Sequence, residues 1–237
     1  MDKIRKSGKC PKEVVDKMIK LYFDGLSSTE SAKETILNKF QKNALLNISK
    51  ELSNLQDIED VCVQYGEKKI FIFNPKPDDF DINMIASSLS RQCRFNGHIR
   101  DDIEIYSVAQ HSFLVAENLP PEYKLVGLLH DAVESFLLDL ITPIKALSPI
   151  YKMIENKCYD SISQKFNLPN PIPKIVKEVD IRVLLTEKRD LLTKCDYVWE
   201  QEKYFTPYEH FKITDCWLPF RAKKEFLKRF YELTENR

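Results

Sequence analysis

Glycine is scarce in this sequence, with 5 residues among 237, whereas phenylalanine and tyrosine number 14 and 10. An all-β fold or a glycine-rich phosphate-binding loop would need more glycine at its turns than this chain supplies. No internal repeat or low-complexity tract is visible, which argues against a solenoid. Helix is therefore expected to dominate the fold.

Paired cysteines and long apolar runs are also missing. The six cysteines are scattered, with no C-x-x-C pair among them, so free thiols are expected. No stretch approaches the roughly 20 apolar residues needed to span a bilayer. No apolar signal-peptide segment follows the charged N-terminus. We therefore expect a cytoplasmic protein without a membrane partner.

Neither sign of charge is in excess, because 36 basic residues balance 36 acidic ones and the pI is near 6.9. No global field marks the protein as a nucleic-acid binder. Residues 1–50 are the local exception, with ten lysines and one arginine against six acidic residues, a net charge of +5. The order of apolar and small residues around Gly25 resembles that of a helix-turn-helix, with Gly25 at the turn. It fits either nucleic-acid binding or a helical appendage whose lysines form a solvated face.

One short region predicts β-structure. In VCVQYGEKKIFIF, residues 61–73, apolar residues alternate on both sides of Gly66, which indicates a hairpin. Asp81 can cap a helix that begins near Ile82. Apolar periodicity predicts two or three helices within 11–55, and further helices at 82–92, 106–118, 121–139, 143–166, 171–200 and 219–234, with a loop at 205–216.

The predicted helix 121–139 contains LLHDAVESFLLD, an apolar stretch that carries ionisable groups. His130, Asp131 and Glu134 lie close together on such a helix, and an unpaired charge among apolar neighbours is costly. Two interpretations stay open for the dipeptide alone. The histidine is a satisfied core residue with acids that pair with lysines, or a divalent cation holds imidazole and carboxylate together.

Two other predicted helices add groups of the same kind. His111 interrupts the apolar pattern of YSVAQHSFLVAENL, and Asp180 lies within IPKIVKEVDIRVLLTEKRDLL. Three apolar helices thus supply a histidine, a His-Asp pair and an aspartate. This set favours a metal site over a single structural histidine.

With these residues in view, the sequence resembles the HD-domain metal-dependent phosphohydrolases, whose signature is a histidine, a His-Asp pair and a distant aspartate. The blocks SRQCRFNGH, YSVAQHS, LLHDAVES, DLITPIK and VDIRVLLTEKRDL are similar to a bacterial and phage branch. That branch is related to the 5'-deoxynucleotidases and to phage deoxynucleoside triphosphohydrolases. The resemblance covers residues from about 61 to the C-terminus. It implies an all-α HD-domain helical bundle around a single metal site, spanning 59–237, with an N-terminal helical extension over 1–58.

The resemblance also implies roles for individual residues. One divalent cation, which can be Mn, Co, Mg, Zn or Fe, would be bound by His111, His130, Asp131 and Asp180. Glu134 matches the catalytic glutamate that orients or deprotonates the attacking water, with pairing to a lysine as the alternative. Asp139 matches a second acid near the site, although it can also simply accept backbone N–H groups.

Substrate contacts are expected from Arg94, Phe95, His98 and Lys145. Arg94 and Phe95 match an arginine-aromatic pair that contacts the nucleotide in the deoxynucleotidases, where the aromatic residue is typically tryptophan. His98 lies in a glycine-containing loop near Arg94, and Lys145 follows Thr142-Pro143. The alternatives are an ion pair of Arg94 with Asp101 or Asp102 and a solvated Lys145. Arg91 has the same alternative as Arg94, and His210 is expected to be a loop histidine.

The expected activity is hydrolysis of nucleotides, deoxynucleoside mono- or triphosphates, by attack of a metal-activated water on phosphorus. A related hydrolase of a signalling nucleotide and a non-catalytic nucleotide-binding or DNA-binding regulator remain as alternatives. Family analogy implies a homo-oligomer, a dimer.

Overall fold

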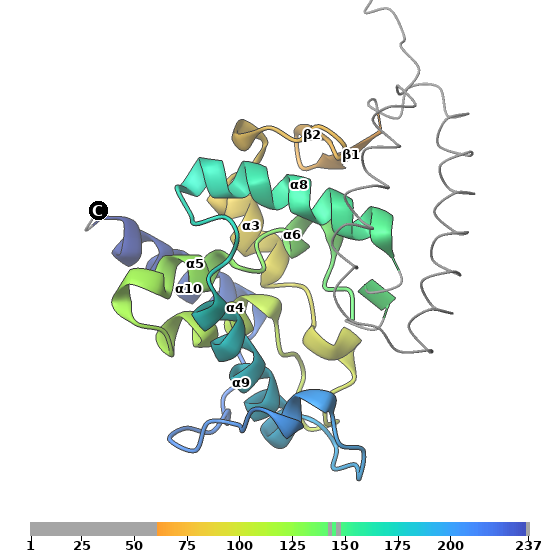
Figure 1. Cartoon of the computed structure of the whole chain (residues 1–237), viewed down its shortest axis with the longest axis vertical. Helices are drawn as coiled ribbons and strands as arrows, with labels where there is room; N and C mark the ends of the chain where they lie inside the picture. Colours follow the sequence, from red (N-terminus) through yellow and green to blue (C-terminus); the bar gives the residue numbers. More distant parts are fainter. Residues whose placement is uncertain (1–60, 142–143, 146–147, 236–237) are drawn as a thin grey trace, which may run out of the picture. The chain divides into compact units, whose positions relative to one another are not determined.

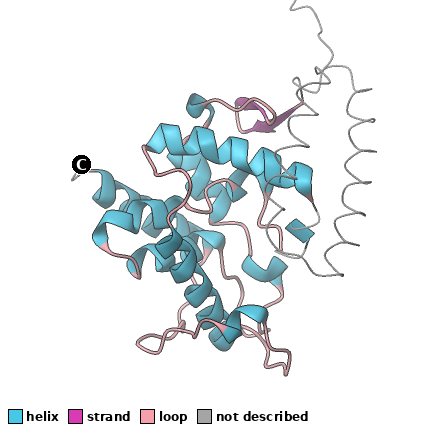
Figure 2. Cartoon of the chain, in the orientation of Figure 1, coloured by secondary structure: helices cyan, strands magenta, loops and turns pink. Residues whose placement is uncertain are grey.

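The computed structural model describes residues 61–141, 144–145 and 148–235, and these are mostly helical (Figure 2). The α-helices are α3 (Ile82–Leu89), α4 (Val108–Glu117), α5 (Lys124–Leu129), α6 (Glu134–Leu137), α8 (Pro149–Phe166), α9 (Lys174–Leu191) and α10 (Pro219–Thr234). Short 3₁₀ turns are η2 (Pro77–Asp79), η3 (Arg94–Gly97), η4 (Pro121–Tyr123) and η5 (Glu200–Lys203). The predicted mostly helical fold with a small hairpin is confirmed. The helices predicted within 11–55 and the extension 1–58 lie outside the described residues.

The chain divides into two compact units, and the candidate site lies within one of them. The larger unit comprises Lys76–Ile141 and Cys158–Arg237. The other comprises Met1–Pro75 and Thr142–Lys157, so it includes the hairpin and the first half of α8.

The hairpin forms where the alternating pattern predicts it. β1 (Cys62–Tyr65) pairs antiparallel with β2 (Lys68–Phe71), and Cys62 lies opposite Phe71. Gly66 turns the chain with φ +59°, a backbone conformation that glycine adopts without steric cost.

Helix α4 is the centre of the larger unit (Figure 1), packing against α5, α9 and α10, while α3 packs against α6 and α10. The side chain of Ser107 caps α4 by accepting a hydrogen bond from the backbone N–H of Gln110. A Cβ atom at Gly127 on α5 would lie 2.2 Å from the side chain of Leu119 and 3.4 Å from the Cα of Ala116. A larger residue at this position would therefore require the Leu119 side chain to move.

The single helix predicted over 121–139 is wrong. The structure has η4, then α5, then a tightened turn over His130–Val133, then α6. Within this turn the backbone N–H groups of Ala132 and Glu134 donate to residues three positions earlier, Leu129 and Asp131. Such i→i+3 bonds are those of a 3₁₀ turn rather than an α-helix.

The other helices agree with the prediction apart from their ends. Asp81 caps α3 as expected, accepting from the backbone N–H groups of Asn83 and Met84, and α10 has the predicted bounds. The helix predicted over 171–200 ends at Leu191. Arg100 covers that end, because its backbone N–H donates to the Leu191 carbonyl and its Nη1 donates to the Asp190 carbonyl.

Two expectations from composition can be compared with the described part of the chain. Its cysteines, at 62, 93, 158, 195 and 216, are all free thiols. None of its helices is long and apolar enough to cross a membrane.

Candidate metal centre

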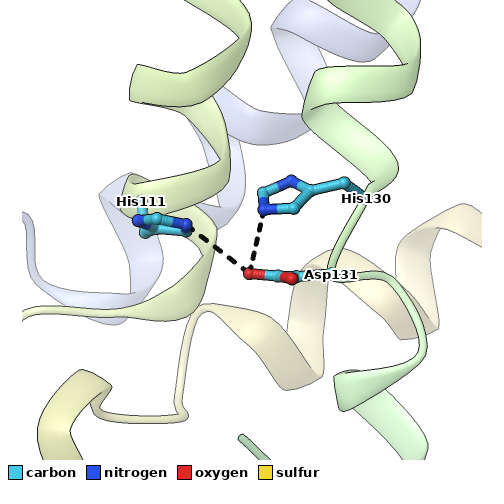
Figure 3. Close-up of side chains that lie close together, drawn as sticks. All are labelled: His111, His130 and Asp131. Carbon is cyan, nitrogen blue, oxygen red and sulfur yellow. Dashed lines mark ion pairs between the residues drawn. The ribbon is translucent and has the colours of Figure 1, made fainter. Parts of the chain in front are cut away.

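Two histidines and an aspartate converge inside the larger unit (Figure 3). His111 comes from α4, and His130 and Asp131 come from the turn between α5 and α6. The three side chains point toward one another, with the Asp131 carboxylate between the two imidazole rings. His111 is fully buried, and the side chain of Asp131 is 17% exposed. These three residues form a group that could hold a metal ion.

Asp180 from α9 lies at the same two nitrogen atoms. The Nε2 atoms of His111 and His130 lie 3.1 and 3.8 Å from Asp180 Oδ1. The same nitrogen atoms lie 3.6 and 3.3 Å from Asp131 Oδ2. Two ligand atoms that are each about 2.1 Å from one cation lie about 3.0 Å apart at an angle of 90° and about 3.8 Å apart at 130°. The four separations therefore match the edges of a metal coordination shell.

Both imidazole rings are oriented through their other nitrogen atom. His111 Nδ1 lies 2.6 Å from Glu187 Oε1, and His130 Nδ1 lies 2.7 Å from the Gly127 carbonyl. A carboxylate or carbonyl oxygen can only accept, so each Nδ1 carries a proton, and in the neutral form of each ring Nε2 has the free lone pair that a metal ligand needs. Neither Nε2 makes a hydrogen bond of acceptable geometry with any residue that the structure describes. Two buried nitrogen atoms thus face two carboxylates without a hydrogen bond.

Glu187 is a central residue that the sequence analysis missed. It is fully buried on α9, and it accepts hydrogen bonds from Tyr106 Oη at 2.8 Å and from Arg94 Nη2 at 3.4 Å, besides its contact with His111. A carboxylate behind a metal-ligating histidine fixes the ring and raises its basicity. Its spacing was the available signal, because Glu187 follows Asp180 by seven residues and two helical turns place both on one face.

Arg94 and Asp139 adjoin this network. Arg94 Nη1 donates to Asp139 Oδ2 at 3.1 Å, so the sequence-based alternative of a surface ion pair with Asp101 or Asp102 is wrong. Asp102 pairs with Arg100 instead.

Asp139 follows a strained turn at the end of α6. Leu138 has φ +72° and ψ 155°, a region that residues other than glycine rarely adopt, and its side chain is exposed. The turn brings Asp139 back to Arg94. Asp139 therefore belongs to the polar network of Arg94 and Glu187, and its predicted role near a metal site stays a prediction.

The centre carries an excess of negative charge. Four carboxylates, those of Glu187, Asp139, Asp131 and Glu134, act on the Arg94 guanidinium, and a fifth, that of Asp180, faces the two histidines. Burial and Arg94 oppose the charged imidazolium, but Glu187 and Asp180 outweigh them and raise the pKa of His111 to about 10. Burial likewise disfavours charge on His130, yet Asp131 and Asp180 raise its pKa. The surrounding carboxylates therefore stabilise a positive charge at the two rings, and a divalent cation bound there would carry such a charge.

Glu134 begins α6 and is buried, 5% exposed. Burial alone would lower the pKa of Arg94, but nearby acids raise it, and Glu134 is one of these acids. The side chain of Asp180 is 35% exposed and that of Asp131 17%, whereas His111 and His130 are almost fully covered. Solvent therefore reaches the centre from the side of the aspartates.

Three further residues were predicted to contact the substrate, and the structure places them in different surroundings. Phe95 packs against the Arg94 guanidinium, which is 5.5 Å from its ring centroid. His98 is exposed after η3. Lys145 belongs to the other unit, where its Nζ is 2.7 Å from Glu155 Oε1.

Two further side chains had been considered only as alternatives. Arg91, in the turn after α3, donates to the backbone and side chain of Ser87, which lies in the last turn of that helix. His210 lies in the loop before α10, as expected, with Nε2 3.1 Å from Asn118 Oδ1.

The chain is similar in sequence to two known proteins. No family model matches it. It is 38% identical over 173 residues to the uncharacterized protein YfdR of Escherichia coli (strain K12), a match that covers 73% of this chain and 95% of that protein. The chain belongs to the YfdR family. A Rhodobacter capsulatus protein, the uncharacterized RCAP_rcc00048, is 34% identical over 118 residues, 46% of this chain and 60% of its own length. Neither relative's name states an activity, so the function of this YfdR-family chain must be argued from its geometry.

Proposed function

We propose that the protein is a divalent-metal-dependent phosphohydrolase of the HD-domain type that acts on nucleotides, namely deoxynucleoside mono- or triphosphates. One observation carries the proposal. The buried Nε2 atoms of His111 and His130 lack hydrogen-bond partners among the described residues, yet they face Asp131 and Asp180 at 3.1 to 3.8 Å. An unsatisfied buried polar atom is costly, and a pair of them at this spacing fits a cation better than a structural role.

The donor set also supports this class of chemistry. Two neutral imidazoles and two carboxylates suit a borderline divalent ion such as Mn, Co, Fe or Zn, and four protein ligands leave positions open in an octahedral shell. When bound, the cation lowers the pKa of coordinated water and neutralises charge on phosphoryl oxygens. Hydrolysis of a phosphoester requires both effects.

Glu134 takes the role of proton acceptor in this proposal. It is buried three residues after Asp131 and interacts electrostatically with Arg94, while Asp131 and Asp180 lie at the nitrogen atoms of the histidines. A carboxylate in hydrogen-bond reach of the attacking water orients it and accepts its proton, which contributes about 10²- to 10⁴-fold to the rate. His111 and His130 would not be available as bases, because the cation would take up their Nε2 lone pairs and their Nδ1 atoms are held by Glu187 and the Gly127 carbonyl.

Arg94 is the group that would meet the phosphate. Its Nη1 and Nη2 atoms are held by Asp139 and Glu187, whereas its buried Nε has no hydrogen-bond partner in the described part of the chain. An oxyanion that accepts this N–H would satisfy the guanidinium and contact a charge fixed in place. In this arrangement Asp139 positions Arg94 and does not touch the substrate.

The proposal is tested by metal analysis and a phosphate-release screen. The full chain, loaded with Mn²⁺ or Co²⁺, is incubated with nucleoside and deoxynucleoside mono-, di- and triphosphates. Orthophosphate from monophosphates would identify a nucleotidase, and a released polyphosphate would identify a triphosphohydrolase. Chelation with EDTA should abolish either activity, and re-addition of the metal should restore it.

Glu134→Ala is the matched control for contamination. This variant should retain the metal and release no product above background. If the metal-loaded wild-type protein and Glu134→Ala give the same low signal with every nucleotide, the phosphohydrolase proposal fails.

A further inference from the structure

Two aromatic side chains from distant parts of the sequence meet next to Arg94, whose guanidinium lies over the Phe95 ring. The ring centroids of Phe95 and Trp199 lie 6.3 Å apart with an interplanar angle of 43°. Phe95 is part of η3, and Trp199 directly precedes η5. We call this pair the aromatic platform. Its two rings are both partly exposed.

The backbone and side chain of Trp199 are held in place by charged neighbours. Lys188 Nζ lies 4.8 Å from the Trp199 ring centroid, and it donates to the Tyr197 carbonyl at 2.9 Å. Glu202 pairs with Lys188 and accepts the backbone N–H of Trp199 at 2.6 Å. A ring that is held before its ligand arrives loses little conformational freedom on binding.

Phe95 is also held, at a conformational cost. Its φ is +54°, and that of Asn96 is +54°, values that side chains larger than glycine seldom adopt. The Arg94 guanidinium lies over the Phe95 ring at 5.5 Å from its centroid. Strain of this kind persists where the surrounding structure fixes it, and it concentrates at ligand sites.

Each half of the platform is joined to a residue of the metal network. Phe95 follows Arg94, which binds Asp139 and Glu187, and Lys188 follows Glu187, which holds His111. Lys188 comes eight residues after Asp180 on α9, so a rise of 1.5 Å per residue places it about 12 Å farther along the helix. An extended nucleoside phosphate can bridge such a span, with its phosphate at the metal centre and its base at the platform.

The surroundings of Trp199 are unusually apolar for a solvated loop. Tyr197 and Val198, the two residues before it, are 70% and 64% exposed. Exposed apolar groups gathered in one place mark binding surfaces more often than chance positions do. A nucleobase suits this one, because its π-face stacks on aromatic rings and nearby cations strengthen the contact.

We propose that Trp199, with Phe95 beside it, stacks on the base of the nucleotide whose phosphate occupies the metal centre. This inference rests on the proposed nucleotide phosphohydrolase function and adds a specificity-determining residue to it. Lys188 and Glu202 act as positioning residues for Trp199. The consequence is that the enzyme discriminates nucleotides from sugar phosphates through the platform rather than through the cation.

The kinetic test compares a substrate that has a base with one that lacks it. Trp199→Leu should raise KM for a deoxynucleoside monophosphate about 10-fold, given the usual contribution of base–aromatic stacking, and leave kcat unchanged. Its kcat/KM for 2-deoxyribose 5-phosphate should equal that of the wild type. An equal loss with both substrates would overturn the inference, because the residue would then be structural. An unchanged KM for the nucleotide would overturn it as well.

A binding test needs no turnover, so it separates this inference from the proposed function. The chain has two tryptophans, and Trp217 packs against Phe113 with ring centroids 5.0 Å apart. In a Trp217→Phe variant Trp199 is the single indole, and a deoxynucleoside without phosphate should quench its fluorescence in a saturable manner. The Trp199→Leu variant, read at Trp217, is the matched control and should show no saturable change.

The combined outcomes are distinguishable. Saturable quenching without phosphate release from any substrate would support the platform and refute the hydrolase. Nucleotide turnover with no quenching and with an unchanged KM in Trp199→Leu would support the hydrolase and refute the platform. If Trp199→Leu fails to fold, the quenching of Trp217→Phe by the deoxynucleoside still decides the question.

Discussion

Two clusters of charged residues include side chains of helix α9, and they differ in how completely their charged groups are paired. Toward its C-terminal end, Arg189 pairs with Asp190 through two contacts of 2.7 and 2.8 Å, and Arg100 pairs with Asp102. These residues line a cavity of about 690 Å³. Toward its middle, Asp180 and Glu187 face His111 from α4. The arginines and aspartates that line this cavity all have protein partners.

The metal centre differs because its partners are incomplete. Asp190 accepts both the Arg189 guanidinium and the backbone N–H of Ile213, so its charge is matched within the fold. The Nε2 atoms of the two histidines have no such match among the described residues. Clustered charge is therefore a poor indicator of a binding site, and unsatisfied buried atoms are a better one. Four substitutions test this contrast.

Removal of a metal-facing carboxylate should have the largest effect. Asp131→Ala deletes an oxygen that lies 3.3 and 3.6 Å from the two Nε2 atoms. Bound metal should fall below roughly a tenth of the wild-type stoichiometry, since a structural ligand is lost, and activity should fall with it. Asp190→Ala is the matched control from the other cluster, and it should lower thermal stability while keeping the metal. A metal-replete, active Asp131→Ala protein would refute the assignment.

Glu134→Gln should separate turnover from metal binding. The amide keeps the volume of the buried side chain but cannot accept a proton, so kcat should fall about 10²- to 10⁴-fold. Metal content by elemental analysis should stay at the wild-type level. Loss of the metal together with activity would instead identify Glu134 as a ligand.

Glu187→Gln should weaken metal binding without removing any residue that would contact the metal directly. The carboxylate that holds His111 Nδ1 is lost, and such partners typically contribute 10- to 100-fold in metal affinity. Competition with a chelator measures the change. Glu178→Gln is the matched control, because it is the same substitution at an exposed position of α9, and it should have no effect. Equal affinities for the two variants would contradict the orienting role.

Asp102→Asn should have the smallest effect. Its pair with Arg100 is largely exposed, and surface ion pairs contribute little to stability. The melting temperature, metal content and activity should all match the wild type. A loss of metal or activity would show that the cavity cluster has a functional link to the centre, and the contrast between the two clusters would fail.

The residues that converge at the candidate centre stand out in the sequence, for a physical reason. His111, His130 and Asp180 each interrupt an apolar pattern, and such interruptions are visible without a structure. Glu187 is invisible in this way, because it lies in TEKRDL, where it looks like an ordinary surface charge. Its spacing of seven residues from Asp180 is the one hint in the sequence, and the packing of α9 against α4 shows that it is buried.

The break between α5 and α6 could not be predicted from local preference. The sequence DAVE, residues 131–134, is compatible with a helix. The turn that forms there instead is held by hydrogen bonds from residues far away in the sequence. Gln92 donates to the Glu134 carbonyl and Ser88 donates to the Ser135 carbonyl, both across more than forty residues of sequence. Tertiary contacts of this kind override helix propensity. By contrast, α10 begins at Pro219, a residue suited to a first helical turn, and its bounds were predicted correctly.

The close approach at Gly127 has a consequence for how the chain can vary. The same residue lets α5 lie against α4 and supplies the carbonyl that orients His130. A Cβ atom at this position would lie 2.2 Å from the Leu119 side chain, so any substitution requires that side chain to move. The packing of α5 against its neighbours and the orientation of the His130 ring therefore depend on the same backbone position.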